Sequence, residues 1–219
     1  MHTKNTGTSQ QSSYPSAQPK RAKNILSVFR INAPVVLGFA LLSLAALILG
    51  AVTGGGTTRL FFSVTRSSLR DPLTYVRLVG HVLGHSSFAH FFSNMSLLLL
   101  LGPIAEEKYG SRNLLVSIIL TAVVSGALHC LFSADTALLG ASGVVFMLIM
   151  LSGFTNVKSG TIPLTLVLVV LIYFGQEVWN GVVQKDNISQ LTHIVGGLCG
   201  IACGIVLNRL PQKKKENRP

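Results

Sequence analysis

The stretch LTHIVGGLCGIACGIVL, residues 191–207, decides the fold class. It contains no Asp, Glu, Lys or Arg and is just long enough to cross a bilayer as a helix. Its one ionisable side chain, His193, is followed by Gly196, Gly200 and Gly204, which share one stripe of a helix. A stripe of small residues lets a neighbouring helix approach closely. The stretch therefore predicts a membrane helix with a close-packed neighbour and a histidine beside the seam.

Working outward, five more apolar segments read as membrane helices of the same kind. We place them at residues 31–52, 88–105, 113–132, 142–154 and 162–183. A polar stretch, 53–87, follows the first of them. The sequence therefore predicts an all-α polytopic membrane protein with six transmembrane helices.

The domain organisation follows from where the apolar segments begin and end. We expect a disordered basic cytoplasmic tail at 1–30, a six-helix membrane domain at 31–208 and a basic cytoplasmic tail at 209–219. Six spans put both ends on one side of the membrane. Because both ends are basic, the positive-inside rule makes that side the cytoplasm.

Composition supports a membrane protein and argues against a nucleic-acid binder. Only 11% of the residues are charged and 49% are hydrophobic, whereas a soluble domain carries about a quarter charged residues. The net charge of +11 is concentrated beside the first and last apolar segments, which is typical of topology signals and contacts with anionic lipid. We expect no nucleic-acid partner. The odd number of cysteines, three, all in apolar segments, does not indicate a disulfide framework.

Polar side chains inside membrane segments are costly and therefore mark candidate functional sites. His90 and Asn94 are four residues apart near the start of the second segment and share one face. Ser142 opens the fourth segment, and His193 opens the sixth. With the N-terminus inside, these three segments run from outside to inside, so all four residues are expected at one depth near the outer leaflet.

This set of side chains suits acyl transfer by a serine. His193 on its glycine stripe could come within hydrogen-bonding reach of Ser142 and act as its base. Gly140 and Gly143 flank Ala141-Ser142 and allow backbone to approach a substrate without Cβ obstruction.

The same region offers donors for a developing oxyanion. The start of a helix leaves amide N–H groups unpaired, and His90 and Asn94 would add side-chain donors. Phe146, one turn after Ser142, is expected against the ring of His193. No carboxylate is placed to complete a triad, because Asp135 and Asp186 fall in loops and Glu177 lies deep in the fifth segment. We infer a Ser–His dyad.

These residues resemble the motifs of the rhomboid family of intramembrane serine proteases. The resemblance rests on HVLGHSSFAHFFSN at 81–94, on GASG at 140–143, and on His193 with Gly196 and Gly200. The turn after the second segment, 101–111, and Arg77 in the first loop are also similar. The departures are Val76 in place of the usual Trp, Thr192 in place of Ala, and Phe146 in place of Tyr.

The resemblance implies a function as well as a fold. Rhomboid proteases of the bacterial six-helix type cut transmembrane protein substrates near the outer leaflet, without metal or cofactor. On that pattern Ser142 attacks, His193 carries the proton, and His90 and Asn94 hold the oxyanion. The resemblance further implies a bacterial inner membrane as the location.

Two other readings stay open. A rhomboid-like protein without catalytic activity could bind membrane clients, although such members typically lack the serine or histidine that this chain has. Alternatively, His81 and His85, together with His90 and His193, could hold a metal ion in a transporter. A serine in a membrane helix usually bonds to its own backbone, which is what we expect of Ser125.

Overall fold

The computed structural model describes residues 32–132, 136–154 and 187–210, with isolated positions between 164 and 175. The predicted tail at 1–30, nearly all of the tail at 209–219 and most of the predicted helix at 162–183 lie outside the described residues. Asp135, Glu177 and Asp186 also lie outside them.

Four described helices are long and apolar enough to cross a membrane. They are α1 (Pro34–Val52), α4 (Phe88–Tyr109), α5 (Ser111–Phe132) and α8 (Asn187–Arg209). The polar stretch between α1 and α4 contains α2 (Gly56–Phe61), α3 (Pro72–Gly80) and a 3-10 turn, η2 (His81–Leu83). Within the described ranges the only strand-like pairing is an isolated bridge between Val64 and Leu138. The fold is an all-α polytopic bundle.

Local signals set where these helices start and stop. Pro34 occupies the first turn of α1, where its missing N–H costs nothing. Ser87 caps α4 by accepting a hydrogen bond from the His90 amide at 3.1 Å. Gly110, with φ of 83°, ends α4 in a conformation that favours glycine, and α5 begins directly after it.

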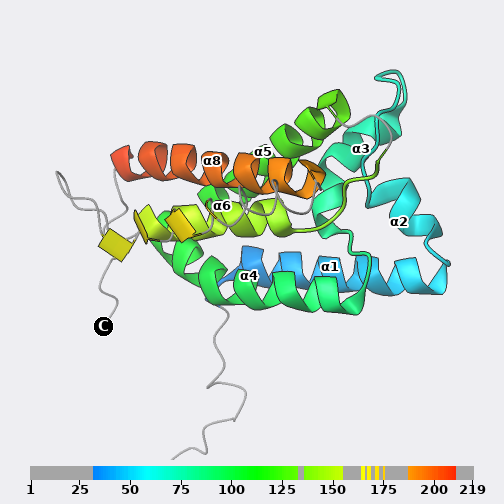
Figure 1. Cartoon of the computed structure of the whole chain (residues 1–219). Helices are drawn as coiled ribbons and strands as arrows, with labels where there is room; N and C mark the ends of the chain where they lie inside the picture. The colour runs from blue at the N-terminus through cyan, green and yellow to red at the C-terminus, as the bar shows by residue number, and fades with distance from the viewer. Residues whose placement is uncertain are drawn as a thin grey trace, which may run out of the picture. The chain divides into compact units, whose positions relative to one another are not determined.

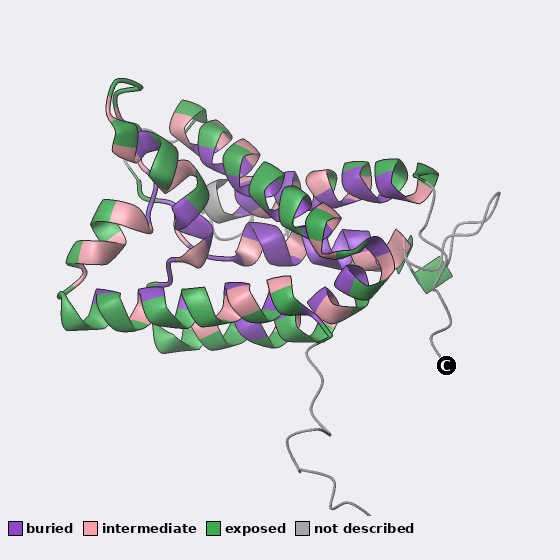
Figure 2. Cartoon of the chain, turned by 180° about the vertical axis from the view of Figure 1, so that it is seen from behind, coloured by how far each residue is buried: buried purple, intermediate pink, exposed green. Residues whose placement is uncertain are grey.

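The central helix, α6 (Ser142–Gly153), is much shorter than its neighbours. Its 12 residues span about 18 Å, which is less than the ~30 Å of a hydrocarbon core. The described helix is therefore shorter than the membrane is thick, and because residues 155–163 lie outside the described residues, the predicted fourth span stays a prediction. Figure 2 shows α6 almost wholly buried among the other helices, while α1 and α4 expose broad outer faces.

The helices alternate in direction. In Figure 1, α4, α6 and α8 run the same way, α1 and α5 run the opposite way, and α2 and α3 lie at the end where α4, α6 and α8 begin. The opposite end is held by Glu106, whose carboxylate accepts from the amides of Val35 and Val36, each at 3.0 Å, and from Ser111 Oγ at 2.7 Å. A buried carboxylate thus caps α1 and ties it to the α4–α5 turn.

Candidate active site

The turn that carries Ser142 is held by backbone hydrogen bonds from the first loop. Val64 and Leu138 exchange two amide–carbonyl bonds of 2.9 Å each. The Gly140 amide donates to the His81 carbonyl, also at 2.9 Å. Gly140 has φ of 125°, a conformation that side chains resist, so only glycine fits the turn without strain. The first loop therefore positions the residues just before α6.

His90 and Asn94 face this turn from α4. A Cβ built on Gly140 would lie 2.9 Å from His90 Nε2 and 3.9 Å from Asn94 Nδ2, so side chains and turn backbone are in close contact. Asn94 Nδ2 is buried and has no hydrogen-bond partner among the described residues. An amide nitrogen only donates, so Asn94 presents an unused donor beside the turn.

The ring of His90 is fixed from its other side. His90 Nδ1 lies 3.2 Å from Ser86 Oγ, and the ring meets that of His85 edge-on at 5.1 Å between centroids. Burial, with His90 nearby as the lesser cause, lowers the pKa of His85 to about 4. His85 is therefore a neutral packing partner at neutral pH, and these contacts leave His90 Nε2 toward Gly140.

The glycine stripe of α8 packs directly on α6. A Cβ on Gly196 would collide with the Gly143 carbonyl, and a Cβ on Gly200 would collide with the Met147 carbonyl. A Cβ on Gly204 would lie 2.6 Å from the Phe154 ring. The close-packed neighbour that the glycine stripe predicts is therefore α6.

His193 lies against α6 at the start of this seam. Its ring stacks on Phe146 with centroids 4.3 Å apart and planes 6° from parallel, which confirms the predicted ring contact. Ser142 precedes Phe146 by four residues and so shares its face of α6. The neighbouring Thr192 reaches Gly143, with Cγ2 3.1 Å from a Cβ built there. Residues of α4, α6 and α8 therefore approach one another around Ser142.

The seam also gives the depth of this meeting point. Gly196, which packs on Gly143, is nine residues after Asn187, where α8 begins. Those residues correspond to about 13 Å of helix. Ser142 thus packs beside α8 well below its first turn.

Two arginines hold the first loop, one within the loop itself and one to the end of α5. Arg77, which the sequence singled out, donates to the Leu60 carbonyl at 3.0 Å and pairs with Asp71 at 3.3 Å. Arg66 was not singled out from the sequence. It donates to the carbonyls of Cys130 and Leu131 at the end of α5, at 2.7 and 2.6 Å. Carbonyls at a helix end attract cations, but sequence spacing gives no sign of so distant a contact.

The other polar candidates named from the sequence include His81 and Ser125. Within the described ranges no three His, Cys, Asp or Glu side chains gather in a metal-ligating arrangement. His81 is buried in η2, and burial, with nearby His129 as the lesser cause, lowers its pKa to about 3. Ser125 donates to the Thr121 carbonyl at 2.7 Å, as expected of a helix serine without a catalytic role.

A polytopic bundle of helices long and apolar enough to cross a membrane defines an integral membrane protein. A family model described as the Rhomboid domain matches residues 72–210. That match covers most of the chain, and the chain belongs to the rhomboid family. No curated protein matches it.

Proposed function

We propose that this rhomboid protein is a serine endopeptidase that cleaves transmembrane proteins within the membrane near the outer leaflet. The observation that carries the proposal is the stacking of His193 on Phe146, on the α6 face that Ser142 shares. The turn before Ser142 faces His90 and Asn94. The proposed nucleophile, base and oxyanion donors therefore come from three neighbouring helices.

The chemistry follows from these positions. Ser142 Oγ attacks the scissile carbonyl while His193 accepts its proton. The tetrahedral oxyanion is held by the Ser142 amide, Asn94 Nδ2 and His90 Nε2. His193 then protonates the leaving amine, and water, activated by the same histidine, releases the acyl group from Ser142. This cycle requires neither a metal nor a cofactor.

The supporting residues act by geometry. Gly140 and Gly143 keep the backbone around Ser142 open to a substrate, and Gly196 and Gly200 hold α8 against α6. Phe146 fixes the ring plane of His193. The proposed dyad assigns no carboxylate to the base, and the stacked Phe146 ring helps to orient the imidazole.

The substrate and orientation follow from the membrane setting. On this proposal the site lies within the membrane, so its substrates are transmembrane proteins that unwind locally there. The basic ends place both termini in the cytoplasm, and the family resemblance points to a bacterial inner membrane.

Cleavage in proteoliposomes tests the proposal. The full chain is reconstituted with a transmembrane substrate, and wild type is compared with Ser142→Ala, His193→Ala and Ser125→Ala. We expect the first two to lose at least about a thousandfold in rate. Ser125→Ala, which removes another buried helix serine, should cut normally.

Cleavage by Ser142→Ala at the wild-type rate would contradict the nucleophile assignment. A folded wild-type protein that binds transmembrane segments and cuts none of them would instead favour a client-binding role.

A further inference from the structure

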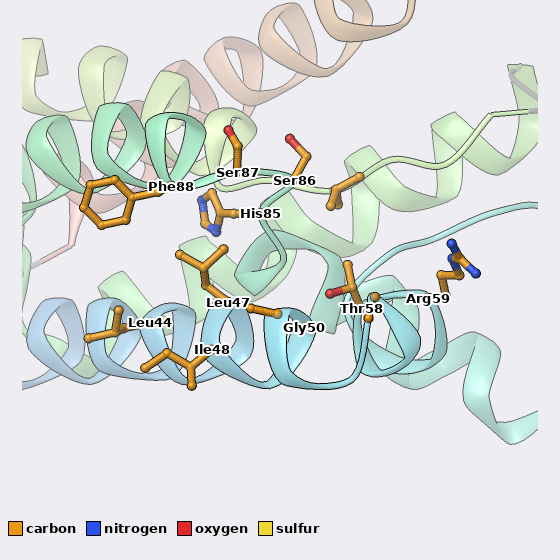
Figure 3. Close-up of a pocket in the computed structure, with 14 residues that line it drawn as sticks. Leu44, Leu47, Ile48, Gly50, Thr58, Arg59, His85, Ser86, Ser87 and Phe88 are labelled. Atoms are coloured by element: carbon orange, nitrogen blue, oxygen red, sulfur yellow. The ribbon is translucent and has the colours of Figure 1, made fainter.

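A cavity of about 880 Å³ lies on the side of α4 that faces α1, away from the α6–α8 seam. Figure 3 shows Leu44, Leu47 and Ile48 of α1 along one wall, and Ser86, Ser87 and Phe88 opposite them. Thr58 and Arg59 of α2 lie at one end. The cavity is therefore apolar along α1 and polar at the end formed by the first loop.

The apolar part lies at membrane depth. Leu44 and Ala51 both line the cavity and, seven residues apart, are separated by about 10 Å along α1. That length covers most of one leaflet, which is about 15 Å thick. Leu44 and Ile48 are exposed on α1, a membrane-spanning helix. An apolar cavity bordered by such residues is open to acyl chains.

A second groove continues the first. It has a volume of about 340 Å³, shares Leu44, and runs between α1 and α4 past Leu41, Phe92 and Leu99. The one hydroxyl along it, Ser96 Oγ, already donates to the Phe92 carbonyl at 2.8 Å. The two cavities form one apolar path along the α1–α4 seam that leads to a polar end.

The polar end carries an unneutralised positive charge. Arg59 is the one arginine, lysine or carboxylate among the residues that line the larger cavity. Among the described residues no hydrogen bond or ion pair engages its guanidinium, whereas Arg66 and Arg77 are both bound to other parts of the chain. Thr58 and Ser86, which both carry hydroxyl groups, line the same cavity. This combination suits a phosphate group.

We propose that this cavity binds an anionic membrane phospholipid, with an acyl chain along α1 and the phosphate at Arg59, Thr58 and Ser86. Acyl chain and phosphate match the two ends of the cavity in chemistry and in order along the membrane normal.

A lipid bound in this cavity would affect the candidate active site. Ser86 lines the cavity and also lies 3.2 Å from His90 Nδ1, and Leu139, directly before Gly140, lines it as well. The lipid would thus fix the hydroxyl that holds His90. This consequence rests on the proposed function, whereas the binding site does not.

Native mass spectrometry of the full chain tests the binding. The Ser142→Ala background separates lipid binding from proteolysis. Phosphatidylglycerol, phosphatidylcholine with the same acyl chains, and sodium phosphate are the probes. We expect one tightly held phosphatidylglycerol, weaker binding of phosphatidylcholine and no displacement by phosphate.

Matched variants locate the site. Arg59→Gln should weaken phosphatidylglycerol binding on the order of fivefold, and Arg70→Gln, in the same loop but outside the cavity, should not. Ala51→Trp should fill the cavity and reduce binding, whereas Ala45→Trp on an exposed part of α1 should not.

Three results would overturn the proposal: equal affinities in Arg59→Gln and Arg70→Gln, equal affinities for the two lipids, or displacement of the lipid by free phosphate. The last would assign the site to a soluble phosphate. If Ala51→Trp fails to fold, the comparison of Arg59→Gln with Arg70→Gln still tests the proposal.

Discussion

The α6–α8 seam and the α1–α4 seam join helices in opposite ways. In the first, Gly196 and Gly200 bring the α8 backbone against the carbonyls of α6. In the second, a Cβ built on Gly102 would lie 2.6 Å from Cγ2 of Val36 and would meet only that side chain. Two cavities open between these helices. Backbone contact fixes a position, whereas side-chain contact can adjust. The proposed dyad lies on the fixed seam, and the proposed lipid site lies on the adjustable one.

The largest effect should come from adding one methyl group to the fixed seam. In Gly196→Ala the Cβ meets the Gly143 backbone, which cannot move without shifting Ser142, so we expect a loss of about 3 kcal/mol or more in stability and loss of cleavage. Thermal unfolding in detergent measures the first, and proteoliposome cleavage the second.

Two glycines on the other seam serve as controls. Gly102→Ala meets a movable side chain and should cost about 1 kcal/mol, and Gly38→Ala, with nothing within 4 Å of its Cβ, should cost nothing. Equal melting temperatures for Gly196→Ala and Gly38→Ala would refute the distinction between the seams.

Next in size is the loss of the carboxylate that anchors α1. Glu106→Ala leaves the Val35 and Val36 amides and the Ser111 hydroxyl without their acceptor, which should cost about 3 kcal/mol. Glu107→Ala, on the exposed side of the same turn, should cost under about 1 kcal/mol. If the two variants unfold at the same temperature, Glu106 does not anchor α1.

Acid should destabilise the fold through His81 and His85, which lie between α3 and α4. The folded pKa of His81 is about 3 and that of His85 about 4, both below the unfolded value of about 6.5. The unfolded chain therefore binds more protons below pH 6.5, and stability falls as pH drops from there toward 4, by up to about 1.4 kcal/mol per pH unit for each histidine.

Melting temperatures at pH 7, 6 and 5 check this dependence. His81→Phe removes one titrating group and should flatten the slope. A melting temperature that stays constant across this range in the wild type would show that these histidines are not buried in the neutral form.

The smallest effect tests how His193 is held. Phe146→Ala removes the ring stacked on His193 and should slow cleavage by roughly tenfold, equivalent to about 1.4 kcal/mol. Phe146→Tyr keeps the ring and should restore the rate while substrate affinity stays unchanged in both. A purely structural role would instead lower the melting temperature of Phe146→Ala and leave the cleavage rate of the folded fraction intact.

Helical periodicity made one part of the site predictable. The offsets from His193 to Gly196 and Gly200, and from Ser142 to Phe146, fix which side chains share a face, and the contacts at both sets of positions follow. Glu106 lies in the stretch 101–111, which resembles the family's turn, and its contacts hold that turn to α1. Periodicity places side chains on a shared face but does not assign their chemistry. The catalytic roles of Ser142, His193, His90 and Asn94 therefore remain proposals.

The loop contacts were not predictable in the same way. The Val64–Leu138 bridge, the reach of Arg66 to α5 and the cavity near Arg59 join residues far apart in sequence with no shared period. The Asp71-Pro72 pair, by contrast, is a recognisable helix start, and α3 begins there within the stretch that composition alone marks only as polar. The six-span count stays a prediction, since residues 162–183 lie mostly outside the described ranges.

The most direct test of the proposed dyad is labelling of the purified, folded protein with a fluorophosphonate. An activated serine reacts with this reagent, and an ordinary helix serine does not. We predict labelling of wild type and of Ser125→Ala, and none of Ser142→Ala or His193→Ala. Labelling that persists in Ser142→Ala, or its absence from a folded wild-type protein, would contradict the assignment of Ser142 and His193 as a working pair.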